Sequence, residues 1–230
     1  MASIRTDKTA STLADGRPAT LRRSIDIAIA ALGLVLASPL LLLIAWLIRV
    51  DDGGPVLFTQ LRLGTNRAPF RIYKFRTMRD GSTTRIGRWL RQTGLDELPQ
   101  LVNVLRGEMS LIGPRPLTSE DVVRLGWDDD AHAVRWSIRP GIIGLAQLYA
   151  GRGKRQSWFL DMTYVRDRRL SLDLGIFAAT AVIGVVGKRR VRAWLRAYRR
   201  RRAMLAARPR LDAGRPAVVD GRNAWPALPR

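Results

Sequence analysis

The sequence predicts an α+β protein that is mainly helical, with an N-terminal membrane helix, a compact body and amphipathic helices at the membrane interface. Three observations lead to this prediction. A long apolar run covers residues 25–50, two short extended segments follow it, and the C-terminal part combines an apolar stretch with an arginine-rich one. The chain of 230 residues is long enough for one domain of ordinary size with extensions.

Residues 1–21 are rich in Ser, Thr and Ala and show no hydrophobic period, which predicts a flexible leader. The apolar run that follows carries only two charges, Asp26 near its start and Arg49 near its end. It is long enough to cross a bilayer, since about 20 apolar residues suffice.

Ser38 and Pro39 interrupt this run, and a proline inside a helix removes a hydrogen bond and bends it. The half before the bend would measure about 20 Å, against a hydrocarbon core of about 30 Å. A re-entrant hairpin over residues 22–50 would therefore keep both ends cytoplasmic, and a kinked transmembrane helix is the alternative. Basic residues lie on both sides: Arg22, Arg23, Arg49, Arg62, Arg67 and Arg71.

Residues 51–187 are expected to form the compact body. Period and turn residues predict two strands and two short helices, then an acidic loop, glycine- and proline-rich loops that line a site, and an apolar helix that packs or lies at the interface. In order, these elements are residues 53–58, 70–78, 85–92, 98–105, 127–130, 137–153 and 172–187.

Charge and composition restrict the partners. Cysteine is absent and His132 is the one histidine, which excludes disulfides and thiolate chemistry and makes structural zinc unexpected. The formal net charge of +21 predicts an anionic partner: nucleic acid, phospholipid or a phosphorylated substrate. Residues 188–210 hold eleven basic residues and no acid, as in a basic amphipathic helix on anionic lipid. A solvated basic helix or a nucleic-acid tail is the alternative, and residues 211–230 read as a disordered tail.

Asp96 and Glu97 in LDELPQ are the most informative local feature. Adjacent helical side chains point about 100° apart, so the two carboxylates can take different roles. A carboxylate can attack phosphorus or hold Mg²⁺, and cations can neutralise the charge of a transferring phosphoryl group. A surface salt-bridge cluster is the ordinary alternative. The cations that could supply this environment are Arg91, Arg115, Arg139, Lys74 and Arg76.

From about residue 22 to 186 the chain resembles the bacterial sugar transferase family of small monotopic phosphoglycosyl transferases. The matching blocks are RSIDIAIAALGLVLASPLLLL, GPVLFTQLRLG, FRIYKFRTM, LDELPQLVNVLRGEMSLIGPRP, RPGIIGLAQ and DMTYVRDRRLSLDLGIF. The block from LDELPQ to GPRP is the most specific of them.

The resemblance implies transfer of a sugar 1-phosphate from a UDP-sugar to polyprenyl (undecaprenyl) phosphate, with release of UMP, at the cytoplasmic face of the bacterial inner membrane. Such a step initiates exopolysaccharide, O-antigen or glycoconjugate synthesis. It implies that Asp96 is a nucleophile that forms a covalent phosphosugar intermediate and lies near Mg²⁺, and that Glu97 is a general base or helps arrange the metal. It also implies a re-entrant first helix at Ser38 and Pro39.

Phosphate binding is expected at Arg91 and Arg115, and more loosely at Lys74, Arg76, Arg139 and Gln147. Residues 79–84 form a shorter connection than the family commonly has, and Leu145 replaces a frequent Trp, so the identity of the sugar is left open. Whether the protein forms a homodimer is left open too. Two further readings stay open: direct attack by the lipid phosphate, and a non-enzymatic membrane-anchored basic protein that binds anionic lipid or nucleic acid. The expected partners are the UDP-sugar, the polyprenyl phosphate and membrane lipids, without nucleic acid.

Overall fold

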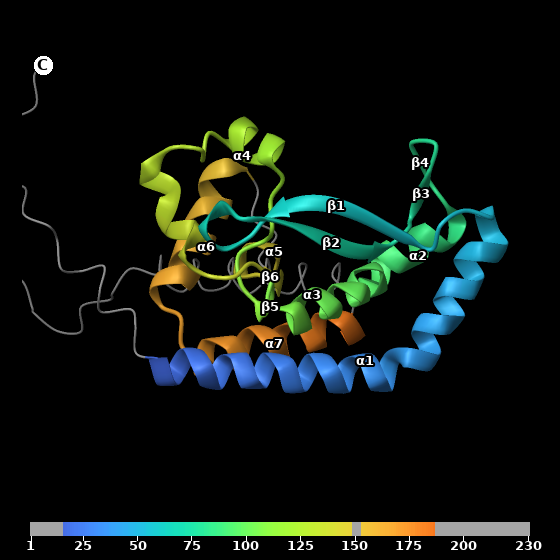
Figure 1. Cartoon of the computed structure of the whole chain (residues 1–230), viewed down its shortest axis with the longest axis horizontal. Coiled ribbons are helices and arrows are strands. Elements are labelled where there is room, and N and C mark those ends of the chain that lie inside the picture. The colour runs from blue at the N-terminus through green and yellow to red at the C-terminus, as the bar shows by residue number, and fades with distance from the viewer. Residues whose placement is uncertain (1–15, 149–152, 187–230) are drawn as a thin grey trace, which may run out of the picture. The chain divides into compact units, whose positions relative to one another are not determined.

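The computed structural model describes residues 16–148 and 153–186. Within these residues the protein is mainly helical, with three small two-stranded sheets (Figure 1). The α+β, mainly helical prediction is therefore confirmed. The predicted basic helix at 188–210, the tail at 211–230 and residues 1–15 of the predicted leader lie outside the described residues.

Helix α1 covers Gly16–Asp52 and contains Pro39. The helix starts before the predicted Arg22, so the leader prediction is wrong for residues 16–21. Figure 1 shows α1 change direction between its darker and lighter blue parts. Next to the proline, the Ser38 hydroxyl donates a hydrogen bond of 2.7 Å to the carbonyl of Val35. The predicted bend is present, and re-entry into the membrane stays a prediction.

The surface of α1 is strongly apolar, although Asp26 is buried in the protein. The Ser110 hydroxyl and the Leu111 amide donate hydrogen bonds of 2.7 and 3.1 Å to the Asp26 carboxylate, which anchors α1 to the body. The helix is long and apolar enough to cross a membrane. An exposed apolar surface of this kind is typical of contact with lipid or with another protein. Its exposed large side chains are Leu21, Ile27, Ile29, Leu32, Val35, Leu36, Leu40, Leu42, Leu43, Trp46 and Val50.

An antiparallel hairpin follows, with β1 (Leu57–Leu63) and β2 (Pro69–Phe75). The strand predicted at 70–78 matches β2 over residues 70–75, whereas the strand predicted at 53–58 overlaps β1 only at residues 57 and 58 and is wrong for 53–56. Asn66 in the connecting turn has φ 53°, a conformation that asparagine tolerates better than most residues. A smaller hairpin follows, with β3 (Met78–Arg79) and β4 (Ser82–Thr83).

Three short helices follow the hairpins: α2 (Arg85–Thr93), the 3₁₀ helix η3 (Leu95–Gln100) and α3 (Leu101–Arg106). The prediction of α2 is confirmed. The single helix expected at 98–105 is instead split at the end of η3. Pro99 accounts for this difference because it has no N–H with which to continue a regular helical hydrogen-bond ladder.

Two parallel strands, β5 (Ser110–Ile112) and β6 (Gly141–Ile143), join the loops that contain GPRP and RPGIIG. The loops approach so closely that a Cβ atom on Gly141 would lie 2.0 Å from the amide nitrogen of Gly113. The Gly113 amide donates to the Ile143 carbonyl, and the Gly141 amide to the Pro114 carbonyl, both at 2.9 Å. Glycine is therefore required at this contact, which places the predicted tight loops beside each other.

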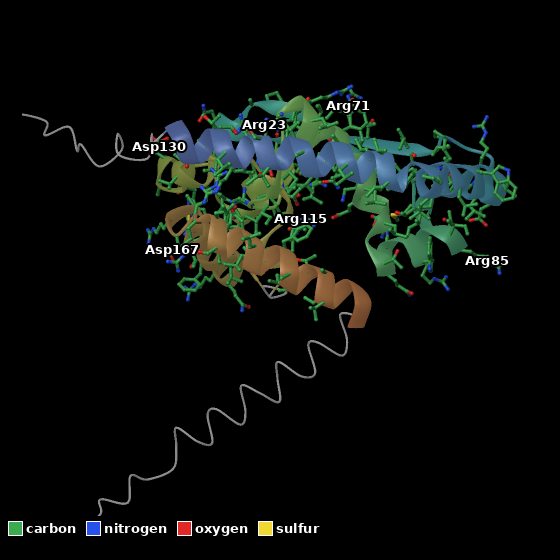
Figure 2. All side chains as sticks on the ribbon, turned by 90° about the horizontal axis from the view of Figure 1, so that it is seen from below. Arg23, Arg71, Arg85, Arg115, Asp130 and Asp167 are labelled. Atoms are coloured by element: carbon green, nitrogen blue, oxygen red, sulfur yellow. The ribbon has the colours of Figure 1, made fainter. Side chains whose placement is uncertain are left out.

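A short 3₁₀ helix, η2 (Thr65–Arg67), lies in the turn between β1 and β2, and the other helices complete the body: α4 (Ser119–Leu125), η4 (Asp130–Ser137), α5 (Leu145–Leu148), α6 (Lys154–Arg166) and α7 (Leu170–Val186). Both views show α1 and α7 on the same side of the body, opposite the β1–β2 hairpin (Figures 1 and 2). The Arg22 guanidinium donates to Asp173 at 2.9 Å and ties their starts together. The predicted apolar helix at 172–187 is thus α7, which buries Ile176 and exposes Leu174, Phe177 and Val182.

Candidate active site

The acid pair lies in the first turn of η3, which packs against β2. Gly94 ends α2 with φ 80° and turns the chain into this segment. Pro99 and Gln100 are buried and hold its far end in the core. Asp96 and Glu97 are therefore held on a short, anchored segment and are each only partly exposed.

Burial raises the pKa of Asp96, and the negative charge of Glu97 raises it further. The charges of Lys74 and Arg91 act in the opposite direction. Asp96 has thus lost part of its hydration and lies near two cations. Such a group is a candidate for covalent chemistry, although ion-pair networks perturb pKa values too.

Lys74 and Arg115 reach the acid pair from two other parts of the chain. The Lys74 ammonium on β2 donates a hydrogen bond of 2.7 Å to Glu97 Oε1. A guanidinium nitrogen of Arg115 lies 4.0 Å from the same oxygen. The structure thus brings together four of the residues that the sequence singled out.

A pocket lies beside Glu97, and three cations, one carboxylate and two amides line it together with apolar side chains. Gln147, another predicted residue, is on this wall, and its Oε1 is buried without a hydrogen-bond partner among the described residues. Arg115 is labelled in Figure 2, between the ribbons of α1 and α7 in that view. The lining residues are Arg62, Ile72, Lys74, Glu97, Gln100, Arg115, Pro116, Gly141, Ile142 and Gln147.

The other three predicted cations do not line this pocket. Arg91 Nε donates to the Thr77 hydroxyl at 2.8 Å, close enough to the site to affect the pKa of Asp96. The Arg76 guanidinium lies against Gly54, where an added Cβ would come within 2.2 Å of it. Arg139 Nε donates at 2.9 Å to the carbonyl of Gly107, at the end of α3. Arg139 thus contacts the backbone at the end of α3, and Arg76 lies beside Gly54.

Sequence reasoning missed Arg62 and Gln100 on the pocket wall, although both stand in blocks that carry the family resemblance. It also missed the buried pair of Arg135 and Asp161, which are 2% and 3% exposed. The position of Asp161 in the block DMTYV was the available signal, but no local pattern names its partner.

Arg135 connects this buried pair to the site. Its Nε donates to Asp161 Oδ2 at 2.9 Å, and another guanidinium nitrogen donates to the main-chain carbonyl of Arg115 at 2.7 Å. The guanidinium also lies over the rings of Trp127 and Trp136. Burial lowers the pKa of Arg135 and raises that of Asp161, while each charge favours the charged form of the other. The buried pair thus holds the main chain of Arg115, which lines the pocket.

The donor atoms around the acid pair fit Mg²⁺ shared with a phosphorylated ligand. In the described part of the chain there is no cluster of three or more acidic or histidine side chains suited to a metal ion. Mg²⁺ is commonly held by one or two carboxylates, with substrate phosphates and water completing the shell. Asp96 and Glu97 could supply that carboxylate part.

The partly desolvated acid pair, the cations near it and a pocket lined by Glu97 are chemically suited to a phosphorylated ligand. The sequence model of the bacterial sugar transferase family matches residues 17–187, and the chain belongs to that family. The predicted family is confirmed.

Three relatives illustrate the similarity. A UDP-glucose:undecaprenyl-phosphate glucose-1-phosphate transferase of Caulobacter vibrioides is 41% identical, over 69% of this chain and 67% of its own. An undecaprenyl-phosphate glucose phosphotransferase of Komagataeibacter xylinus is 38% identical, over 69% of this chain and 35% of its own. A UDP-N-acetylgalactosamine-undecaprenyl-phosphate N-acetylgalactosaminephosphotransferase of Aeromonas hydrophila is 42% identical, over 58% of this chain and 35% of its own. The chain thus spans between about a third and two thirds of the length of these relatives.

Proposed function

We propose that the protein transfers a sugar 1-phosphate from a UDP-sugar to undecaprenyl or another polyprenyl phosphate. The observation that carries the proposal is the acid pair of η3, partly desolvated and surrounded by Lys74, Arg91 and Arg115. The names of the relatives supply the substrate classes: a UDP-sugar as donor and undecaprenyl phosphate as acceptor. Family membership speaks against the alternative of a non-enzymatic basic protein.

The proposed chemistry has two displacements at phosphorus. A carboxylate oxygen of Asp96 attacks the β-phosphorus of the UDP-sugar, and the bond to the bridging oxygen breaks so that UMP leaves with the electron pair. A phosphate oxygen of the polyprenyl phosphate then attacks the same phosphorus and displaces Asp96. The products are UMP and a polyprenyl diphosphate-linked sugar, and the carboxylate is regenerated.

The surrounding residues would stabilise charge during both steps. Lys74 is held by Glu97 at 2.7 Å and also acts on Asp96, so it lies near the carboxylate that is proposed to react. Arg91 and Arg115 add positive charge near the acid pair, which would stabilise the charge on the phosphoryl oxygens in the transition state. Glu97 orients Lys74 and is the candidate general base. Mg²⁺, held by Asp96 with the donor phosphates, would neutralise further charge on the diphosphate.

Membrane attachment follows from the acceptor. A polyprenyl phosphate is insoluble in water, so its phosphate must be met at the lipid surface. The exposed apolar surface of α1 suits that position. We propose that α1 dips into the cytoplasmic leaflet of the inner membrane and returns at the bend near Pro39, with the body in the cytoplasm.

Release of UMP tests this function. Membranes with the protein, undecaprenyl phosphate and each of several UDP-sugars should release UMP with at least one donor, and the two donors that the relatives use are the first to try. The same donor, with label in the sugar phosphate and no acceptor, should leave label on the protein. Turnover without trapping would favour direct attack by the lipid phosphate, and no transfer with any donor would refute the proposal.

Accessibility of single cysteines tests the proposed re-entry. Ser24→Cys and Asp51→Cys place thiols at exposed positions on the two arms of α1, in a chain that has no cysteine of its own. Both thiols should react with a membrane-impermeant maleimide only after the cells are permeabilised, so that the reagent reaches the cytoplasmic side of the membrane. Reaction of one of them from the outside in intact cells would instead show a helix that spans the membrane.

A further inference from the structure

Arg62 is a pocket residue whose hydrogen bonds are incomplete. It lies on β1, and its side chain is 14% exposed. One terminal nitrogen donates to Asp121 Oδ2 at 3.2 Å and to the Pro116 carbonyl at 3.3 Å. The other donates to Gln60 Oε1 at 2.6 Å. The Nε atom is buried, and no acceptor lies within hydrogen-bond distance of it among the described residues.

The charges around Arg62 favour an anion in the pocket. Burial lowers the pKa of Arg62, and the positive charge of Arg115 lowers it further, whereas Asp121 acts in the opposite direction. Two guanidinium groups thus share one pocket. Glu97 is the one carboxylate among the lining residues, and it already pairs with Lys74. The pocket wall therefore carries more positive than negative charge.

A purely structural role for Arg62 would be to clamp β1 to the start of α4. The bond to Asp121 serves that role, because Asp121 also belongs to the capping box of α4 with Thr118. A clamp explains the two terminal nitrogens and leaves the buried Nε–H without an acceptor. Burying an N–H donor without an acceptor is costly, so an acceptor that arrives with a ligand would complete its hydrogen bonding.

We infer that Arg62 binds a phosphate oxygen of a substrate in this pocket, through its Nε–H and together with Arg115. Arginine suits this task because its fork can hold Asp121 and a phosphate at once. The identity of the phosphate rests on the proposed function, in which both the UDP-sugar and the polyprenyl phosphate carry one. The shared chemistry is a phosphate group, and kinetics with each substrate separates the two sources.

The kinetic test compares two changes at Arg62 with two matched controls. Arg62→Gln removes the charge and the Nε–H, and Arg62→Lys keeps the charge alone. Asp121→Asn and Gln60→Ala remove the structural partners but keep Arg62. For Arg62→Gln we expect KM to rise about ten- to a hundred-fold for one substrate, since one charge-assisted hydrogen bond is lost. The KM of Arg62→Lys should lie between those of the wild type and Arg62→Gln. Both controls should keep KM values within about threefold of the wild type, even where their Tm falls.

The substrate whose KM rises identifies the phosphate that Arg62 binds. A rise for the UDP-sugar at saturating polyprenyl phosphate assigns Arg62 to the donor, and a rise for the lipid at saturating donor assigns it to the acceptor. Unchanged KM values for both substrates in Arg62→Gln would overturn the inference. The same holds if Asp121→Asn raises KM as much, because the effect would then come from a lost clamp.

A binding measurement tests the inference without turnover. Inorganic pyrophosphate should raise the Tm of the detergent-solubilised full chain and of Asp121→Asn, and the shift should fall by at least half in Arg62→Gln. An equal shift in all variants would contradict phosphate binding by Arg62. If no UDP-sugar supports UMP release but the pyrophosphate shift depends on Arg62, the proposed function fails and the phosphate site stands.

Discussion

Asp96→Asn is expected to abolish UMP release, with a loss of at least about 10⁴-fold, as is usual when a covalent nucleophile is removed. The amide has nearly the shape of the carboxylate, so packing in η3 should be preserved, but its nitrogen and oxygen carry no charge with which to attack phosphorus. Labelled sugar phosphate should no longer become attached to the protein. The measurement is UMP release and trapping in membranes that contain equal amounts of each variant.

Although Asp96→Asn should lose activity, its folded state should not lose stability. Burial and Glu97 raise the pKa of Asp96 in the folded protein, so its charged form is less favourable there than in the unfolded chain at neutral pH. Replacement by a neutral amide should therefore leave Tm unchanged or raise it. Asp80→Asn, at a side chain that is 91% exposed, is the matched control and should leave activity unchanged. Native turnover in Asp96→Asn would end the nucleophile assignment.

Asp161→Ala is expected to cost about 3–5 kcal/mol of the free energy of unfolding, as is typical when one partner of a buried ion pair is removed. The change would leave Arg135 buried, 2% exposed, without its counter-charge. The same guanidinium holds the carbonyl of Arg115, so phosphate binding in the pocket should weaken as well. Denaturation of the solubilised protein measures the first effect, and the KM values for the donor and the acceptor measure the second.

Two further variants separate stability from positioning. Arg124→Ala removes an ion pair to Asp121 in which the arginine is 75% exposed, and such surface pairs contribute about 1 kcal/mol or less. The double change Arg135→Met with Asp161→Leu should recover much of the stability, because apolar pairs can replace buried ion pairs. It should not restore whichever KM Asp161→Ala raises, since the Arg115 carbonyl would still lack the hydrogen bond from Arg135. Asp161→Ala with wild-type stability would contradict a structural role for the pair.

Local patterns predicted the regular elements well. The apolar run, the bend at Pro39, strand β2 and helix α2 follow from hydrophobicity, proline geometry and turn residues, all of which act within a few residues. The errors lie at boundaries: α1 starts at Gly16, the first strand covers Leu57–Leu63 instead of 53–58, and the helix expected at 98–105 is split near Pro99. Helix ends depend on the packing of neighbouring segments, which local patterns do not contain.

The candidate site was only partly predictable, because its members come from separate parts of the chain. Asp96, Glu97, Lys74, Arg115 and Gln147 were recognised as chemically suitable, and the structure places all five at or next to the pocket. Arg76 and Arg139 were equally suitable in type, but neither lines the pocket, and Arg139 binds the carbonyl of Gly107 instead. Residue type alone could not separate these two groups of cations.

Composition and spacing along the chain are enough to establish that a long apolar helix precedes an acid pair and that several arginines lie near this pair in sequence. Which of the cations contact the pair depends on the folded chain. The contact of Gly113 with Gly141 sets where Arg115 lies, and the hairpin register sets where Lys74 and Arg62 lie. The positions of these side chains depend on which segments pack together, and packing is a property of the whole folded chain.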